Sequence, residues 1–462
     1  MLRYNRLQSI APLLLLAAVD CSLLLASFFI GLEVSWVELD AFWPDVLVYL
    51  PHALFYTLVI WSMMFAVGLY HARYFATLAD VAVRLSVVIT LSLFIFSIVF
   101  YLWPSVIIWR SIMSPALVVA FGAIVVTRVV ARKTLSTKAL RRRVLVMGVG
   151  KKAEAIAELE RTGQAFGFTC VGYYEIPKEL KRVPAGCIVD QEEPLIRVVE
   201  RLKPDEIVLA ADDRRGRLPL EALWECRRQN VSVIDYLTFY ERETGSVDLD
   251  ALQLDWFLFS PGFSNSWLHK ALKRLLDLCV CLCLLALFLP LIVATAILIR
   301  LESPGPVIFR QTRVGSNGRS FTLFKFRSMA VASESDGTPL WAAANDPRVT
   351  RVGAVIRKLR IDELPQIFNV LKGDMSFVGP RPERPFFVQQ LTQEIPYYLE
   401  RHRVKPGITG WAQVNYRYGS SIEDARIKHR YDLYYLKHGS FLLDVLIILQ
   451  TIRVVLWPEG VR

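Results

Sequence analysis

Four apolar stretches, each close to twenty residues long, occupy the first third of the chain and most constrain how it can fold. They predict transmembrane helices over residues 10–32, 46–69, 81–103 and 107–126. The last stretch is the least regular, because Arg110 and Pro115 interrupt it. A mean hydropathy of +0.37 agrees with a membrane protein. We therefore predict a four-helix transmembrane bundle over residues 1–130.

The charges beside these stretches predict their orientation. Arg3 and Arg6 precede the first stretch, whereas residues 33–45 carry four acidic side chains and no lysine or arginine. Residues 128–143 carry seven basic side chains and no acidic one. Because basic loops stay in the cytoplasm, both ends of the bundle are expected there. The first stretch lacks a cleavage site of small residues and is interpreted as a retained helix, not a signal peptide.

The net charge of +11 lies largely next to apolar segments. This arrangement favours attraction to anionic lipid head groups, so no nucleic-acid partner is expected. The seven cysteines have no metal-binding spacing, and a mostly cytoplasmic chain is expected to contain no structural disulfide. The six histidines form no constellation and are interpreted as surface or core residues.

Residues 140–250 predict a small Rossmann-like domain with a mostly parallel sheet, because short apolar runs alternate with helical segments. The first run, 144–147, is followed at 148–153 by a Gly-x-Gly-x-x-Ala pattern, which lets a phosphate approach a helix N-terminus. Glu175 is a poor candidate for the acidic residue that usually completes a dinucleotide site. We favour a structural or regulatory domain, with a dinucleotide site as the alternative.

A linker over residues 251–266 precedes a fifth apolar stretch at 275–299. Basic residues flank both its ends, which favours the cytoplasmic face for both. Pro290 stands in the middle and interrupts helical hydrogen bonding. We predict a re-entrant membrane helix over about residues 270–300, broken at Pro290, with a kinked spanning helix as the alternative. The last apolar run, 441–457, is expected to lie on the membrane or beside this helix, with a sixth span as the alternative.

Six motifs follow this stretch in a fixed order. They are Ser-Pro-Gly-Pro at 303–306, Arg-Val-Gly at 313–315, Phe-Lys-Phe-Arg at 324–327, Asp-Glu-Leu-Pro-Gln at 362–366, Gly-Pro-Arg-Pro-Glu at 379–383 and Lys-Pro-Gly-Ile-Thr-Gly-Trp-Ala-Gln at 405–413. Together they resemble the catalytic domain of bacterial polyprenyl-phosphate glycosyl-1-phosphate transferases, over residues 267–462. The whole chain resembles the large monotopic type that starts exopolysaccharide synthesis, and most of all the subgroup associated with exosortase (PEP-CTERM) loci.

This resemblance implies a mainly helical monotopic catalytic domain on the cytoplasmic face of a bacterial inner membrane. It implies transfer of a sugar-1-phosphate from a UDP-sugar, expected to be UDP-glucose or UDP-galactose, to undecaprenyl phosphate, with release of UMP. The implied mechanism is ping-pong, through a phosphosugar-aspartate, and a single ternary-complex displacement is the alternative. We expect a homodimer.

The resemblance places the nucleophile on Asp362. A carboxylate attacks a diphosphate poorly, so the site must neutralise phosphate charge and align the attacking oxygen. Pro365 favours the first turn of a helix, which would put Asp362 near a helix N-terminus. Neighbouring residues on a helix point about 100° apart, and a bridging Mg²⁺ would reconcile the two carboxylates. Glu363 is therefore predicted as the principal Mg²⁺ ligand, with Asp362 sharing the ion.

Basic and polar residues around this pair are predicted to bind phosphate or substrate. Arg357 and Arg381 suit bidentate phosphate binding, and the resemblance places Lys325 and Arg327 near the phosphate. The full predicted set is Arg357, Arg381, Lys325, Arg327, Glu383, Thr409, Gln413 and Arg417. For Thr409, Gln413 and Arg417, a purely structural turn is the alternative.

Two other classes of function remain as rivals. A non-catalytic membrane scaffold could recruit later glycosyltransferases, but the chain retains the carboxylate pair and Arg381 that a scaffold would not need. A nucleotide-sugar oxidoreductase or epimerase using the glycine pattern would leave the motifs after residue 303 unexplained.

Overall fold

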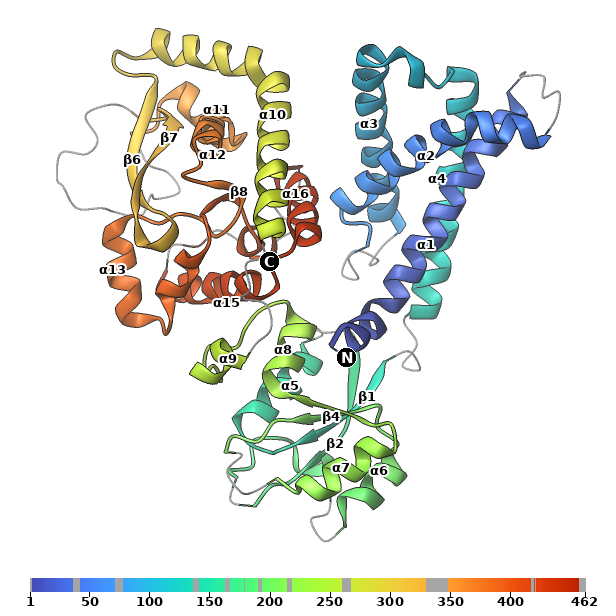
Figure 1. The fold of residues 1–462 in the computed structure, drawn as a ribbon, viewed down its shortest axis with the longest axis vertical. Coiled ribbons are helices and arrows are strands. Elements are labelled where there is room, and N and C mark those ends of the chain that lie inside the picture. Colours follow the sequence, from blue (N-terminus) through green and yellow to red (C-terminus); the bar gives the residue numbers. More distant parts are fainter. Residues whose placement is uncertain are drawn as a thin grey trace. The chain divides into compact units, whose positions relative to one another are not determined.

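The protein divides into two compact units, Met1–Gly245 and Ser246–Arg462 (Figure 1). The computed structural model describes residues 2–35, 42–70, 78–135, 141–162, 167–177, 179–189, 193–213, 218–259, 267–329, 348–416, 419 and 421–456. Residues 246–259, where the sequence predicted the end of the α/β domain and a linker, belong to the second unit.

All four apolar stretches of the first unit form helices. These are α1 (Leu2–Val34), α2 (Phe42–Ala66), α3 (Leu78–Leu102) and α4 (Arg110–Leu135). Each helix contains a segment of at least 20 residues that is long and apolar enough to cross a membrane. Helices α1 and α3 each contact both α2 and α4. Large apolar side chains such as Leu15, Leu47 and Val118 remain exposed on the outer surfaces, as expected of helices surrounded by lipid.

A buried ion pair joins α1 to α4. Arg128 Nη2 lies 2.7 Å from Asp20 Oδ2, and both side chains are essentially inaccessible to solvent. The Tyr70 hydroxyl also donates to Asp20, at 2.9 Å, and Thr127 does so at 3.1 Å. Charged groups in apolar surroundings need such partners. These contacts bring together the middle of α1, the segment just after α2 and the C-terminal part of α4.

The rest of the first unit is the predicted parallel α/β fold. Its elements are β1 (Arg142–Met147), α5 (Lys151–Arg161), β2 (Phe168–Tyr174), β3 (Ile188–Val189), α6 (Leu195–Leu202), β4 (Glu206–Leu209), α7 (Leu220–Arg228), β5 (Ser232–Asp235) and α8 (Tyr236–Thr244). The strand order is β3-β2-β1-β4-β5, and every pair is parallel. Leu145, Met147 and Ile207 point to the face covered by α6 and α7, where they form the core.

The second unit is mainly helical, as predicted. Its helices are α9 (Leu254–Phe259), α10 (Trp267–Glu302), α11 (Arg351–Lys358), α12 (Gln366–Lys372), α13 (Pro385–Glu394), α14 (Trp411–Asn415), α15 (Ile422–His438) and α16 (Phe441–Leu456). Its strands are β6 (Ile308–Val314) and β7 (Ser320–Phe326), which form an antiparallel hairpin, and β8 (Ser376–Val378) and β9 (Gly407–Thr409), which pair in parallel. Residues of α10, β7, α12, β8 and α16 share one core.

Helix α10 does not end at Pro290, where the sequence predicted a break. It continues as one helix of 36 residues with the proline inside. Figure 1 shows two limbs that meet at a steep bend, and proline accounts for the bend because it removes one helical hydrogen bond and clashes with the preceding turn. Most of α10 is apolar and exposed, and only 11% of its most apolar segment is buried.

The second unit holds both ends of α10. Near the start, Lys273 Nζ donates to the backbone carbonyl of Val378 (3.0 Å) and to Asp444 (2.9 Å). Just beyond the last turn, Arg327 donates to the carbonyl of Ser303 at 2.7 Å. Helix α16, which carries Asp444, contacts α10, so the prediction that the last apolar run packs beside this helix is confirmed.

Candidate active site

The two adjacent carboxylates lie in a short 3-10 turn, Ile361–Glu363, between α11 and α12. Arg360, just before the turn, has a φ of 59°, a left-handed conformation that is uncommon outside glycine. This conformation turns the chain back, so that Arg360 Nη1 lies 3.6 Å from Glu363 Oε1. Pro365 directly precedes α12, as predicted.

Asn369 fixes α12 against the β6-β7 hairpin. Its side chain is fully buried; Nδ2 donates to the carbonyl of Thr322 (2.7 Å), and Oδ1 accepts from the backbone N–H of Phe324 (3.0 Å). These paired bonds satisfy the buried amide and lock the helix to β7. Because Glu363 precedes α12 and Lys325 belongs to β7, this lock sets the two charged groups opposite each other.

Three cations converge on one oxygen of Glu363. Arg381 Nη2 lies 2.7 Å from Oε1, Lys325 Nζ lies 3.2 Å from it, and Arg360 is the third cation. Burial tends to raise the pKa of Glu363, but the charges of Arg381 and Lys325 outweigh it and hold the pKa well below its usual range. Glu363 is therefore ionised and already compensated by neighbouring charges.

Asp362 has the opposite environment. It is partly buried, and among the described residues its carboxylate has no hydrogen-bond partner. Burial, followed by the charge of Glu363, raises the pKa of Asp362. Burial also lowers the pKa of Lys325, against the opposing charge of Glu363. The site thus combines a carboxylate held by cations with a neighbouring carboxylate whose oxygens are available to react.

A second layer positions Arg381 through its backbone. Arg401 Nη2 donates to the carbonyl of Arg381 at 3.0 Å, and Arg313 Nη1 donates to the carbonyl of Pro382 at 2.9 Å. Arg401 is itself held by a buried ion pair with Asp432 at 2.8 Å. Arg401 and Asp432 are thus positioning residues that sequence reasoning missed, because they lie outside the six motifs.

Two predicted phosphate-binding arginines make other contacts. Arg327 donates to the carbonyls of Ser303 (2.7 Å), Pro304 (3.0 Å) and Ile299 (3.3 Å), at the C-terminal end of α10. This position suits a cation that caps a helix C-terminus and gives Arg327 a structural role. Arg357 lies in the last turn of α11 and makes no ion pair with Glu363 in the described part of the chain, whereas its neighbour Arg360 does.

The remaining predicted residues are mostly engaged within the fold. Glu383 pairs with Arg313 at 3.6 Å. The Thr409 hydroxyl lies 2.7 Å from a threonine hydroxyl of α16, and Gln413 Nε2 donates to a carbonyl of β9 at 3.0 Å. Gln413 Oε1 is buried and has no hydrogen-bond partner among the described residues. Arg417 lies outside the described residues.

The carboxylate pair fits a magnesium ion that is shared with substrate. Mg²⁺ in phosphate-transfer sites takes one or two carboxylates, with phosphates and water supplying the other oxygens. Glu363 Oε2 and both Asp362 oxygens have no described partner, so these oxygens would hold the ion. Nowhere in the described ranges do three or more His, Cys, Asp or Glu side chains cluster as a metal site made by protein alone.

In the glycine pattern of the first unit, the carboxylate of Asp212 occupies the position at the helix N-terminus where a phosphate would bind. The backbone N–H groups of Lys151 and Lys152, at the start of α5, donate to Asp212 (2.9 and 3.2 Å). A Cβ atom on Gly150 would lie 2.1 Å from Asp212 Oδ2, so glycine is needed for this close approach. A phosphate at this helix N-terminus would have to displace Asp212, which favours a structural role for the turn.

Comparison with known proteins agrees with this site. The family described as bacterial sugar transferase matches residues 268–458. An Aeromonas hydrophila UDP-N-acetylgalactosamine-undecaprenyl-phosphate N-acetylgalactosaminephosphotransferase is 50% identical over 52% of this chain and 56% of its own length. An Escherichia coli UDP-glucose:undecaprenyl-phosphate glucose-1-phosphate transferase is 35% identical over 68% of this chain and 67% of its own. A putative Bacillus subtilis N-acetylgalactosaminyl 1-phosphate transferase is 55% identical over 29% of this chain and 74% of its own.

The chain belongs to the bacterial sugar transferase family. The match to the Aeromonas relative spans just over half of that relative's length. The family match covers the second unit, where the carboxylate pair and its cations lie. Neither a scaffold nor an oxidoreductase finds support in these comparisons.

Proposed function

We propose that the protein transfers a sugar-1-phosphate from a UDP-sugar to undecaprenyl phosphate and releases UMP. The curated relatives are named for this type of reaction. The observation that carries the proposal is the contrast between the two carboxylates, since Glu363 is held by three cations while Asp362 has no hydrogen-bond partner among the described residues. This division of labour suits covalent phosphoryl transfer.

In the first half-reaction, an oxygen of Asp362 attacks the sugar-bearing phosphorus of the UDP-sugar. A phosphorus–oxygen bond to Asp362 forms as the bond to the bridging oxygen breaks, and that oxygen leaves with UMP. Arg381, Lys325 and Arg360, which face Glu363 in the described structure, would divide their charge between Glu363 and the diphosphate. Such preorganised positive charge is the main contribution a protein makes to phosphoryl transfer.

In the second half-reaction, a phosphate oxygen of the lipid acceptor attacks the same phosphorus. The bond to Asp362 breaks, and its carboxylate is regenerated as the sugar leaves on a polyprenyl diphosphate. The same cations serve both half-reactions, because both develop negative charge at one phosphorus centre. The alternative is one displacement in a ternary complex, in which Asp362 acts as base or ligand.

We further propose that a magnesium ion is held by Asp362 and by Glu363 Oε2. When bound, this ion would neutralise diphosphate charge and stabilise the leaving UMP. The donor is proposed to be a UDP-hexose. UDP-glucose and UDP-galactose follow from the family resemblance, and UDP-N-acetylgalactosamine joins them because a relative with 50% identity is named for it.

The site is proposed to lie at the cytoplasmic face of a bacterial inner membrane, with α10 as a re-entrant element. The support is that one compact unit binds the start of α10 through Lys273 and its end through Arg327. A straight helix of 36 residues would be about 54 Å long and would carry its ends to opposite sides of a bilayer. A water-soluble donor and a lipid-embedded acceptor can then meet at the head-group level. A homodimer remains the proposed assembly.

The test is UMP release by purified protein in detergent with Mg²⁺, undecaprenyl phosphate and each of the three UDP-sugars. Asp362→Asn and Glu363→Gln should each abolish release, whereas Glu394→Gln, an exposed carboxylate at the end of α13, should retain it. With radiolabelled sugar and no acceptor, the parent protein should retain label and Asp362→Asn should not.

Two results would overturn these proposals. If a folded parent protein released no UMP from any donor, the transferase proposal would be wrong. If Asp362→Asn retained activity, Asp362 would not be the nucleophile. Release that requires the acceptor, with no label on the protein in its absence, would favour the ternary-complex route.

A further inference from the structure

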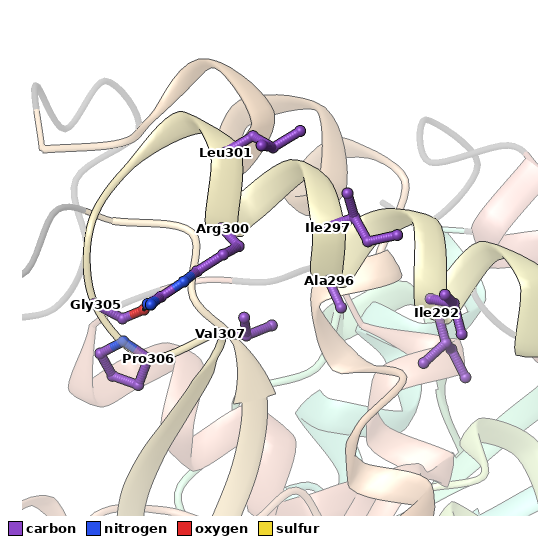
Figure 2. A pocket seen from close by; sticks show the side chains of 9 residues that line it. Ile292, Ala296, Ile297, Arg300, Leu301, Gly305, Pro306 and Val307 are labelled. Carbon is purple, nitrogen blue, oxygen red and sulfur yellow. The ribbon is translucent and has the colours of Figure 1, made fainter.

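A groove runs along the second limb of α10, defined here as the helical residues after Pro290. Its volume is about 570 Å³, within the range typical of ligand sites. It lies between this limb and the loop that leads into β6, and Figure 2 shows the side chains that line it. The α10 groove is lined by Ile292, Val293, Ala296, Ile297, Arg300, Leu301, Gly305, Pro306 and Val307.

The groove is apolar with one cation. Val293, Ile297 and Leu301 expose 50%, 54% and 77% of their surface, which is unfavourable in water and suits contact with hydrocarbon. Arg300 is the single charged residue of the lining; Figure 2 shows it reaching from α10 to Gly305, whose carbonyl accepts from Nη1 at 2.8 Å. Arg300 has no carboxylate partner among the described residues, so its positive charge is not neutralised there.

The groove and the turn that carries the two carboxylates pack against one hydrophobic cluster. Ile292, Ala296 and Val307 line the groove and also pack against a core cluster built on Ile299, Phe326 and Ile356. The same cluster is contacted by Ile361 and Leu364, the residues on either side of the Asp362–Glu363 pair. The groove and the turn that carries the reacting carboxylates are therefore connected through the same hydrophobic cluster.

We propose that the α10 groove binds the isoprenoid chain of the lipid acceptor, over the units nearest its phosphate, and that Arg300 attracts this phosphate. The proposal rests on the proposed function, which requires a polyprenyl phosphate beside Asp362. The occupant must be apolar along the groove and anionic at one end, and it must come within reach of the carboxylates. A polyprenyl phosphate has all three properties, whereas an ordinary phospholipid has no reason to lie beside the reacting groups.

The test introduces a large side chain into the groove and compares the effect with that of the same substitution at a neighbouring position outside the groove. Ile297 lines the groove, whereas Leu298, with a similar exposure of 52%, lies on the same limb outside the lining. Ile297→Trp should raise the KM for undecaprenyl phosphate about tenfold, roughly the loss of contact with two methylene groups. Its KM for the UDP-sugar and its labelling by donor alone should stay unchanged. The KM of Leu298→Trp for undecaprenyl phosphate should stay within about twofold of the parent value. Arg300→Ala should raise the KM for undecaprenyl phosphate and leave the KM for the UDP-sugar unchanged.

A photolabel tests the same proposal without mutation. A polyprenyl phosphate carrying a diazirine on its first isoprene unit should label residues 292–307 of the parent protein, in nanodiscs of phosphatidylethanolamine and phosphatidylglycerol. Excess undecaprenyl phosphate should prevent the labelling, and excess phosphatidylglycerol should not. Labelling elsewhere, or equal competition by phosphatidylglycerol, would overturn the proposal.

The two proposals fail in different ways. A parent protein without acceptor-dependent UMP release would refute the proposed function. An active parent protein with equal acceptor KM values for Ile297→Trp and Leu298→Trp would refute the groove alone. If Ile297→Trp also lost its labelling by donor, the photolabel on the parent protein would decide.

Discussion

Glu363→Gln and Asp362→Asn make the same chemical change at neighbouring positions, yet we expect opposite effects on stability. Glu363 is an ion that Arg381 and Lys325 compensate, so removing its charge leaves two partly buried cations facing each other. Burial and the charge of Glu363 both disfavour the ionised form of Asp362. Removing the charge of Asp362 should therefore relieve an unfavourable interaction.

The expected magnitude follows from burial. Losing one partner of a fully buried ion pair costs about 3 to 5 kcal/mol, whereas a surface pair is worth about 0 to 1 kcal/mol. The exposed fractions of the Glu363, Lys325 and Arg381 side chains are 12%, 20% and 27%, and that of Arg360 is 55%. Glu363→Gln should therefore cost about 2 kcal/mol, between these limits. Asp362→Asn should cost nothing or stabilise slightly.

The pH dependence has a definite sign for each group. The pKa of Glu363 is lower in the folded than in the unfolded protein. Its stabilising contribution to folding is therefore present above the unfolded-state pKa and is lost as the pH falls through the folded-state pKa. The folded pKa of Asp362 is raised, so its contribution is present below the unfolded pKa and is lost as the pH rises through the folded value. The difference between the two variants should therefore be small in acid and widen towards neutral pH.

The assay is thermal unfolding in one detergent, followed by tryptophan fluorescence, which the 11 tryptophans of the chain permit. Midpoints should be compared at one heating rate and at several pH values, because unfolding of such a protein is expected to be irreversible. At neutral pH, Glu363→Gln should lower the midpoint by several degrees, and Asp362→Asn should leave it equal to or above that of the parent protein. An equal fall in both variants would refute the assigned charge distribution.

Three further outcomes are expected. Arg401→Gln should lower kcat for UMP release about tenfold or more, because the Arg381 carbonyl loses its hydrogen bond from Arg401. Asp432→Asn, which removes the ion pair that holds Arg401, should lower kcat by a similar factor. Full activity in both variants would contradict the positioning role. Gly353→Ala should lower the free energy of unfolding by about 1 to 3 kcal/mol, the range typical of overpacking, because its Cβ would lie 2.1 Å from the Ser328 carbonyl oxygen; an unchanged unfolding midpoint would contradict this packing. EDTA should stop UMP release and excess Mg²⁺ should restore it; unaffected release would remove the metal from the proposal.

Much of the fold could be predicted from local pattern. A run of about twenty apolar residues can bury itself only in lipid or in a large core, so α1 to α4 were predictable one by one. The alternation of short strands with helices likewise predicted the parallel sheet around β1. The bend of α10 was harder, since a proline predicts an interruption but not whether the helix resumes as the same element.

The carboxylate pair was predictable because its residues are contiguous and its motif is specific. The cations around it were only partly predictable. Lys325 and Arg381 do face Glu363, but the third cation is Arg360 and not Arg357, and a left-handed residue decides this. The residues next to Arg360 in the sequence do not predict a left-handed conformation at this position.

Only the tertiary structure decided what distant residues do for one another. The pairing of Arg401 with Asp432 and the capping of α10 by Arg327, which directly follows β7, each join different elements of the chain. Local sequence determines which segments form helices or strands, the orientation that flanking charges give to membrane segments, and the chemistry within a motif. These properties depend on neighbours a few residues away. Long-range contacts depend instead on how whole helices and strands pack, and that packing assigns one arginine to phosphate chemistry and another to a helix end.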